Sequence, residues 1–193
     1  MIIEKLIGKF DYIQSGYTKD GVAFQLRPAT LADVEQITAN IQAVCAENAY
    51  LHSSTFMLTD EWRQTMRYPA DAKAGRLLLV AQLGDTVIGH LRLFPEWYGA
   101  NGRHVGEIGL ALVKPWRERG LGTAMLAYAQ AWAEHTRFQK LTAAVIATNQ
   151  RALNLFARFG FTEEGRRLQQ VHLGGQYVDD VLLGRFLNGY QAP

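Results

Sequence analysis

The sequence predicts a single α/β domain, in which strands and helices alternate over most of the chain. Two segments, residues 107–132 and 141–159, each read as a buried strand followed by a helix. Two further pairs of strands flank glycine-containing turns, at Gly84-Asp85 and Gly174-Gly175, which is typical of hairpins. A chain of 193 residues with 48% hydrophobic residues is long enough to bury one well-formed core.

The first elements are a strand over Val22 to Arg27 and an amphipathic helix. Thr30 and Asp33 stand three residues apart and resemble a capping box, which marks the start of that helix. Its apolar face is made by residues at helical spacing, namely Leu31, Val34, Ile37, Ile41 and Val44. A second helix is expected over residues 59–66.

The two hairpins occupy residues 77–94 and 167–186. Within the first, strands over 77–82 and 87–94 flank Gly84-Asp85, and within the second, strands over 167–173 and 177–186 flank Gly174-Gly175. Residues 1–21 precede the first strand as an N-terminal extension. They form either an extra strand pair or an arm that covers substrate or a partner subunit, and the sequence favours neither.

The most informative segment follows the buried strand Glu107 to Val113. Pro115 ends that strand, and the run 117–123 leads into a helix that opens at about Gly120. The first turn of a helix carries N–H groups without intrahelical partners and favours negative charge. Gly120 and Gly122 let the backbone approach an anion closely, and Arg117 and Arg119 add positive charge. The segment therefore predicts a pyrophosphate site.

The common nucleotide motifs do not explain this segment. It contains neither Gly-x-x-x-x-Gly-Lys-Ser/Thr nor Gly-x-Gly-x-x-Gly. The pattern Arg-x-x-Gly-x-Gly, at Arg117, Gly120 and Gly122, resembles the acyl-CoA signature of the GNAT superfamily of N-acetyltransferases. The alternative is a helix that needs the two glycines only for close packing.

A second segment, Asn149 to Phe161, resembles the other GNAT signature, Asn-x-x-Ala-x-x-Leu-Tyr-x-x-x-Gly-Phe. It predicts a helix with one apolar face, which Gly160 ends as a left-handed cap. The resemblance runs from about Gln25 to the C-terminus, so residues 22–193 are assigned to a GNAT domain. It implies a mixed, twisted central sheet with helices on both faces.

The resemblance also implies an acetyl-CoA site. In that fold two parallel strands splay apart and hold the pantetheine, and Asn149 contacts it, although Asn149 can equally be a helix N-cap. Contacts to the pantetheine are implied for Ala111, Leu112 and Val113, and backbone contacts to the pyrophosphate for Glu118, Arg119, Gly120, Leu121, Gly122 and Thr123.

The implied reaction is direct attack of a primary amine on acetyl-CoA in a ternary complex. Glu107 stands where several GNAT enzymes place a catalytic base, and the alternative is a solvated carboxylate at a strand end. The N–H near Leu112 would stabilise the oxyanion. Phe156 replaces the tyrosine that commonly protonates the leaving thiolate, so the chain is either a catalyst without that acid or a protein that only binds acyl-CoA. Substitutes for the acid would come from Tyr98, Tyr128, Tyr177 or His172.

The acceptor is expected to be a small amine, a polyamine or an amino acid, with a peptide N-terminus as the alternative. The segment from Gly165 to Asp180 resembles the last hairpin of enzymes that act on such acceptors. Trp97 and Tyr98 are candidate walls of the acceptor pocket. The carboxylates that could neutralise a cationic acceptor, or simply solubilise the surface, are Glu96, Glu107, Asp179 and Asp180.

Composition argues against several other classes of protein. A net charge of +2 is too small for nucleic acid to be the main partner, and Cys45 alone cannot form an internal disulfide. No stretch approaches the roughly 20 apolar residues of a membrane helix, and the charged N-terminus is unlike a signal peptide. The five histidines show no metal-ligand spacing. We therefore expect a cytoplasmic protein without a metal; dimers are common in the family, and residues 1–21 offer a surface for one.

Overall fold

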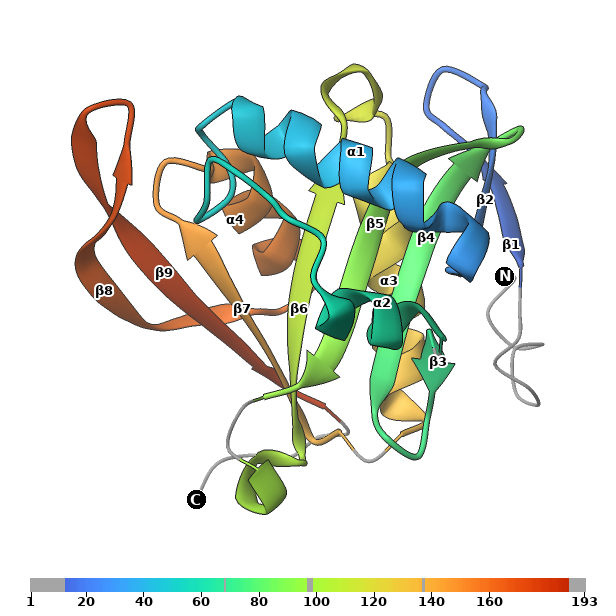
Figure 1. Ribbon diagram of the computed structural model, residues 1–193. Coiled ribbons are helices and arrows are strands. Elements are labelled where there is room, and N and C mark those ends of the chain that lie inside the picture. Colours follow the sequence, from blue (N-terminus) through green and yellow to red (C-terminus); the bar gives the residue numbers. More distant parts are fainter. Residues whose placement is uncertain (1–12, 68, 97–98, 137, 188–193) are drawn as a thin grey trace.

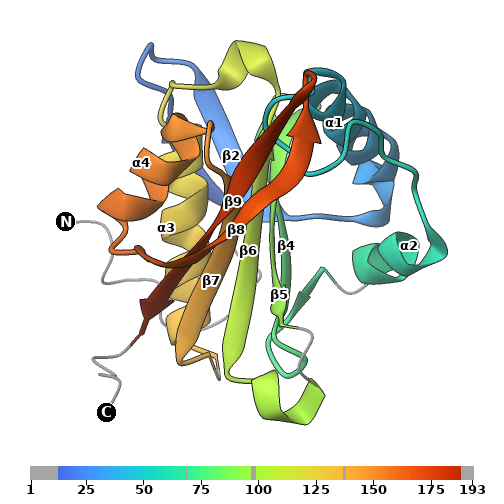
Figure 2. The ribbon, with the colours of Figure 1, turned by 90° about the vertical axis from the view of Figure 1, so that its left-hand side faces the viewer.

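The structure, a computed structural model, describes residues 13–67, 69–96, 99–136 and 138–187. They form one nine-stranded sheet with helices on both faces (Figure 1). Helices α1 (Val34–Ala46) and α2 (Asp60–Arg67) lie on one face, and α3 (Leu121–Glu134) and α4 (Gln150–Arg158) lie on the other (Figure 2). The predicted mixed sheet between two helical layers is confirmed.

The strands follow the order β1-β2-β4-β5-β6-β7-β9-β8, with β3 paired to the free part of β4. All neighbours pair antiparallel except β6 and β7, which are parallel. The strands are β1 (Gln14–Tyr17), β2 (Ala23–Pro28), β3 (Ala70–Asp71), β4 (Arg76–Leu83), β5 (Thr86–Pro95), β6 (Val105–Leu112), β7 (Lys140–Ile146), β8 (Thr162–Leu173) and β9 (Gln176–Phe186).

Two strands, β1 and the two-residue β3, are absent from the predicted set, and β8 is longer than predicted. β1 lies within the first 21 residues and pairs with β2, so the described part of that segment adds a strand to the sheet. The prediction began β8 at Arg167, whereas the strand starts at Thr162. Its first half is almost entirely exposed and polar, so it lacks the apolar alternation that marks a half-buried strand.

The core is divided by the sheet. On β4, Leu77 and Leu79 point into the layer under α3, while Leu78 and Val80 point into the layer under α1. Both faces of this strand are buried, which explains its continuous apolar run. Trp132 of α3 is among the largest fully buried side chains of the α3 layer.

The ends of the helices follow from local chemistry. The Asp33 carboxylate accepts a hydrogen bond from the backbone N–H of Thr30 at 2.7 Å, so the predicted cap is present. Leu31 was wrongly placed on the buried face: it lies in a 3-10 turn before α1 and is 55% exposed. At α4, the Asn149 side chain accepts from the N–H of Ala152 at 3.2 Å, and Gly160 has φ +76° after the last turn, as predicted.

Candidate active site

The site begins where the two parallel strands part. β6 and β7 pair only from Val105 to Glu107, opposite Lys140 to Thr142, and then diverge (Figure 1). Beyond this point β7 continues beside β9, and β6 continues to Leu112 beside β5. One edge of β6 therefore faces a gap instead of a strand, as the sequence led us to expect.

The backbone N–H and C=O of Leu112 face this gap. The N–H of Val113 donates to the carbonyl of Ile88 on β5 at 3.1 Å. Because a trans peptide points its N–H and C=O in opposite directions, the Leu112 carbonyl points away from β5. In an extended strand, the N–H of the same residue points to that side as well, so Leu112 presents both polar groups to the gap.

The loop after β6 is held in an unusual conformation. Glu118 has φ +65°, and Gly120, which caps α3, has φ +94°. A Cβ at Gly120 would have as its nearest neighbour the Lys19 Cγ at 3.8 Å, so the space above this glycine is open. A Cβ at Gly122 would lie 3.2 Å from Leu155 of α4. Gly120 thus provides the left-handed turn and the open space above it, which we call the Gly120 cradle. Gly122 instead allows α3 and α4 to pack closely.

Arg117 and Arg119 of this loop are paired with carboxylates, whereas their positive charges were expected from the sequence to be available to an anion. The Arg117 guanidinium donates from Nε to the Leu112 carbonyl at 2.7 Å and from both terminal nitrogens to the Glu47 carboxylate. These hydrogen bonds from Arg117 hold the pKa of the Glu47 carboxyl below its usual range. Arg119 pairs with Asp20 at 2.7 Å and covers the Trp116 ring. Both arginines therefore have carboxylate partners.

Other cations line the cleft beside the loop. Lys19, Arg151 and Arg158 all face a cleft of about 670 Å³ between the end of β6 and the N-terminal ends of α3 and α4. No motif marks them, because Lys19 precedes both signature segments, and Arg151 and Arg158 stand at positions that the second signature leaves open. The backbone of Lys19 donates to the Arg119 carbonyl at 2.9 Å, which ties the N-terminal segment to the loop.

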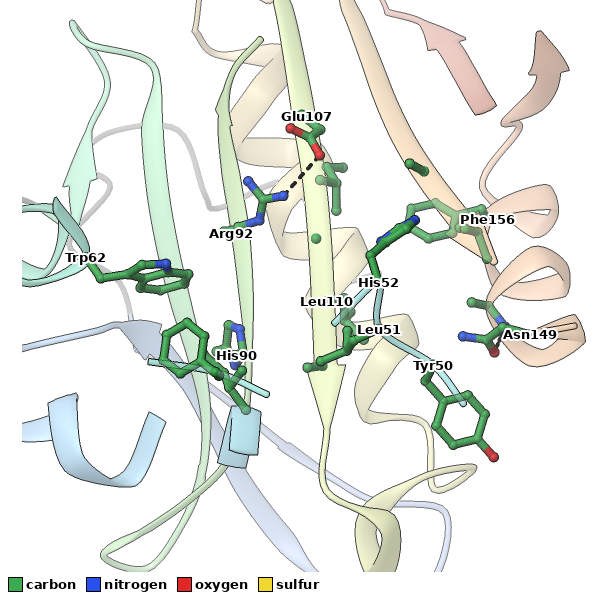
Figure 3. Close-up of a pocket in the computed structure, with 18 residues that line it drawn as sticks. Tyr50, Leu51, His52, Trp62, His90, Arg92, Glu107, Leu110, Asn149 and Phe156 are labelled. Carbon is green, nitrogen blue, oxygen red and sulfur yellow. Dashed lines mark hydrogen bonds and ion pairs between the residues drawn. The ribbon is translucent and has the colours of Figure 1, made fainter. Parts of the chain in front are cut away.

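A smaller cavity of about 230 Å³ continues from this cleft towards the middle of the sheet (Figure 3). Glu107 and Arg92 lie on adjacent strands in its wall and form an ion pair of 3.0 Å. Both side chains are about one-third exposed. The residues that line both spaces, and so join them, are Tyr50, Leu51, Leu110, Ala111, Asn149 and Ala152.

A family comparison identifies this arrangement. Residues 39–161 match the model of the acetyltransferase (GNAT) family. The chain belongs to this family. It is an acetyltransferase, and acetyl-CoA is the co-substrate of the family.

Individual relatives agree with this assignment. The chain is 26% identical over 156 residues to the L-amino acid N-acetyltransferase AaaT of Escherichia coli, covering 79% of this chain and 89% of that one. It is 25% identical over 154 residues to an N-alpha-acetyltransferase of Sulfolobus acidocaldarius, covering 76% and 84%. Its fold is similar to the putative acetyltransferase yncA of Salmonella typhimurium with acetyl-CoA, at a TM-score of 0.78, 20% identity and coverage of 88% and 97%.

Phe156 stands where the second sequence signature has tyrosine. Phe156 is 4% exposed, lines the smaller cavity and packs edge-on against Phe161 at 5.0 Å. Of the proposed substitutes, Tyr128 is buried in the α3 core, and Tyr177 and His172 pack against each other on the β8–β9 hairpin. None of these three lines either space, and Tyr98 lies outside the described residues.

Tyr50 is a functional candidate that the sequence reading missed. It lies in the segment after α1, lines both spaces, and packs against the guanidinium groups of Arg117 and Arg151 at 4.7 and 5.6 Å from the ring centre. The segment between α1 and α2 has no regular periodicity, so only the fold brings this ring to the cleft.

Two histidines also enter the smaller cavity. His90 of β5 is buried, and burial together with the neighbouring Arg92 lowers its pKa to about 4. Its Nδ1 has no hydrogen-bond partner within the described residues, and its ring meets Trp62 edge-on at 6.3 Å. The Nε2–H of His52 donates to the carboxylate of Asp180 on β9, with Nε2 and Oδ1 2.8 Å apart.

The four carboxylates that were expected to neutralise a cationic acceptor lie in different environments. Asp180 is 1% exposed and binds His52 and, at 3.4 Å, Arg167. Glu96 accepts from the Thr142 hydroxyl, and Asp179 accepts from the Gln169 N–H. Of the four carboxylates, Glu107 alone lines the smaller cavity. Trp97 and Tyr98, proposed as pocket walls, lie outside the described residues.

In the described part of the chain, no group of three or more histidine, cysteine, aspartate or glutamate side chains is placed to hold a metal ion. The same residues include no helix that combines the length and the apolar character needed to span a bilayer.

Proposed function

We propose that this acetyltransferase transfers the acetyl group of acetyl-CoA to the α-amino group of an amino acid, by direct attack in a ternary complex. The observation that carries this proposal is the Glu107–Arg92 ion pair in the wall of the smaller cavity. The larger cleft takes acetyl-CoA and the smaller cavity takes the acceptor, so the thioester lies where the two spaces join.

The acetyl-CoA assignment uses the chain's own groups. The backbone amides from Glu118 to Thr123 hold the pyrophosphate above the open Gly120 cradle, with charge from Lys19, Arg151 and Arg158. The pantetheine lies along the backbone at Ala111, Leu112 and Val113, where the N–H of Leu112 faces the gap and serves the oxyanion. Asn149 and Phe156 border the junction. Arg117 acts indirectly in this scheme, since its side chain holds Leu112 and Glu47 in place.

Charge in the smaller cavity favours a zwitterion. An α-amino acid carries an ammonium group for Glu107 and a carboxylate for Arg92, so both members of the ion pair gain a partner. A polyamine would bring only positive charge towards Arg92. A peptide N-terminus would bring the ammonium group without an adjacent free carboxylate. The amino-acid specificity in the name of the E. coli relative supports the first assignment, and the name of the Sulfolobus relative supports the peptide alternative.

Glu107 contacts the acceptor amine in this proposal and can take its proton. An alkylamine with a pKa of about 10.4 is almost fully protonated near neutral pH, so the reaction needs a group that accepts a proton. A carboxylate on the acceptor side of β6 serves both to bind the ammonium form and to receive that proton.

The experiment compares pairs of acceptors that differ only in the carboxylate. L-Phenylalanine and its amide, and the corresponding pairs for other side chains, are assayed for amine-dependent CoA release. Hydrogen bonds to charged groups contribute about 1.5–3 kcal/mol, so we expect kcat/KM to be about 10- to 100-fold higher for the free acid. In Arg92→Gln this preference disappears, whereas Arg63→Gln on the exposed surface of α2 keeps it. Equal rates for acid and amide in the wild-type protein would contradict the assignment.

A further inference from the structure

His52 is held at the edge of the acceptor cavity by a carboxylate from a distant part of the chain. It lies in the segment between α1 and α2, and its Nε2 meets Oδ1 of Asp180 on β9 at 2.8 Å. Asp180 is 1% exposed, and its other oxygen faces Arg167 at 3.4 Å. Such a buried carboxylate fixes the orientation of an imidazole ring.

The second nitrogen of His52 is left for a ligand. Since Nε2 is used by Asp180, Nδ1 is the free position, and within the described ranges the structure gives it no hydrogen-bond partner. The side chain is 46% exposed and lines the smaller cavity, so it is open both to the acceptor and to solvent. In Figure 3, His52 lies on the side of the cavity where Phe156 also lies.

We propose that His52 carries the proton of the transfer reaction, with Asp180 as its positioning residue. This inference rests on the proposed acetyl transfer to an amine but not on which amine is used. The amine nitrogen forms the bond to the acetyl carbon, and the carbon–sulfur bond breaks with its electron pair on sulfur. The bound ammonium group first gives one proton to Glu107, which passes it to solvent. His52 accepts the second proton, which the nitrogen loses as the new bond forms, and returns it to the thiolate, so the histidine is unchanged after each turnover.

The assignment of His52 explains two features of the site. Glu107 already has a cationic partner, because Arg92 lies 3.0 Å from its carboxylate, whereas the ring of His52 is held by Asp180 through Nε2 and keeps Nδ1 open to the cavity. Phe156 lines the same cavity and has no proton to give. A histidine can both accept and donate a proton, so it replaces the acid that phenylalanine cannot supply.

The charged groups around His52 come from four strands. Asp180 on β9 faces it directly, and Arg167 on β8 binds the same carboxylate. Glu107 on β6 and Arg92 on β5 line the same cavity and compensate each other. His90 on β5 and Tyr50 in the same segment as His52 are the other titratable groups in the cavity wall.

The test compares His52→Gln with Glu107→Gln, using whichever acceptor the wild-type protein turns over best. We expect His52→Gln to lower kcat by about 100-fold, which is within the usual range for general acid–base catalysis. Acetyl-CoA affinity should be unchanged, because His52 does not line the larger cleft. Glu107→Gln should raise KM for the acceptor and also lower kcat, and added imidazole should not restore its activity. His172→Gln, on the β8–β9 hairpin, is the matched control and should behave like the wild-type protein.

Two further readouts separate proton transfer from a structural role. In His52→Ala, added imidazole should restore part of the lost activity, and in His172→Ala it should have no effect. In Asp180→Asn, loss of the carboxylate that orients the ring should lower kcat in the same direction as His52→Gln and leave KM for the acceptor nearly unchanged. An unchanged kcat in His52→Gln, or no rescue by imidazole in His52→Ala, would overturn the inference. Turnover of a polyamine or peptide instead of an amino acid would overturn only the acceptor assignment.

Discussion

Buried His90 should make the stability of the fold depend on pH between about pH 4 and 6.5. Its pKa is lowered from an ordinary value of 6.5 to about 4 by burial and by Arg92. Between these values the unfolded chain binds a proton at His90 that the folded protein does not bind. The free energy of unfolding therefore rises with pH in this range: the contribution is fully present above about pH 6.5 and is lost as the pH falls towards about 4.

The size of this effect follows from the two pKa values. A difference from 6.5 to about 4, at about 1.4 kcal/mol per pH unit, corresponds to about 3 kcal/mol of unfolding free energy. The carboxyls of Asp33 and Glu47, whose pKa values are lowered by arginine partners, contribute only at lower pH, because their ordinary values are 3.8 and 4.5. Of these three groups, His90 contributes most between pH 4.5 and 6.5, with an expected loss of about 2–3 kcal/mol.

Urea unfolding at half-unit steps from pH 7.5 to 4.5 measures this dependence. We expect His90→Gln, which cannot be protonated, to remove most of the slope between pH 6.5 and 4.5, whatever its effect on stability at pH 7.5. His172→Gln, in an exposed position, should keep the wild-type slope. A wild-type stability that stays flat across this interval, or the same slope in His90→Gln, would refute the reasoning.

Two further predictions concern the larger cleft, where we propose that acetyl-CoA binds. Glu47→Gln removes the carboxylate that pairs with the mostly buried Arg117 guanidinium, so urea unfolding at pH 7 should show a loss of about 1–2 kcal/mol. The variant should also lose less stability than the wild-type protein below about pH 4.5, where the Glu47 contribution disappears, and an unchanged midpoint at pH 7 would contradict the pairing. Gly120→Glu places a negative charge in the cradle at φ +94°, and calorimetry should show acetyl-CoA affinity at least about tenfold weaker. Gly84→Glu, also at positive φ with open space around it, should match its cost in stability and bind acetyl-CoA normally; equal affinities in the two variants would show that the cradle is misplaced.

The parts of the fold that the sequence predicted are those encoded by contiguous residues. The run from Arg117 to Thr123 contains both the turn and the helix N-terminus, so its conformation could be inferred without knowing any distant partner. The same holds for Asn149, whose side chain caps the helix three residues away. The gap between β6 and β7 was expected because the resemblance to the family supplied it.

The side-chain partners in the site could not be predicted in this way. Arg117 was assigned a free charge because its partner, Glu47, lies 70 residues earlier on the end of α1. His52 and Asp180 are 128 residues apart in the sequence. They meet only because β9 pairs with β7 and the segment after α1 reaches β9. His52 and His90, which line the smaller cavity, belong to no local motif, so no spacing along the chain marks them.

Release of the CoA thiol by the purified protein tests the central claim most directly. Acetyl-CoA is supplied with amino acids, their amides, polyamines, aminoglycosides and short peptides, and the acceptor-dependent rate is measured for each. The account predicts a clear rate with free amino acids that exceeds the rate with their amides. Tight acetyl-CoA binding without acceptor-dependent release, across the whole panel, would contradict it.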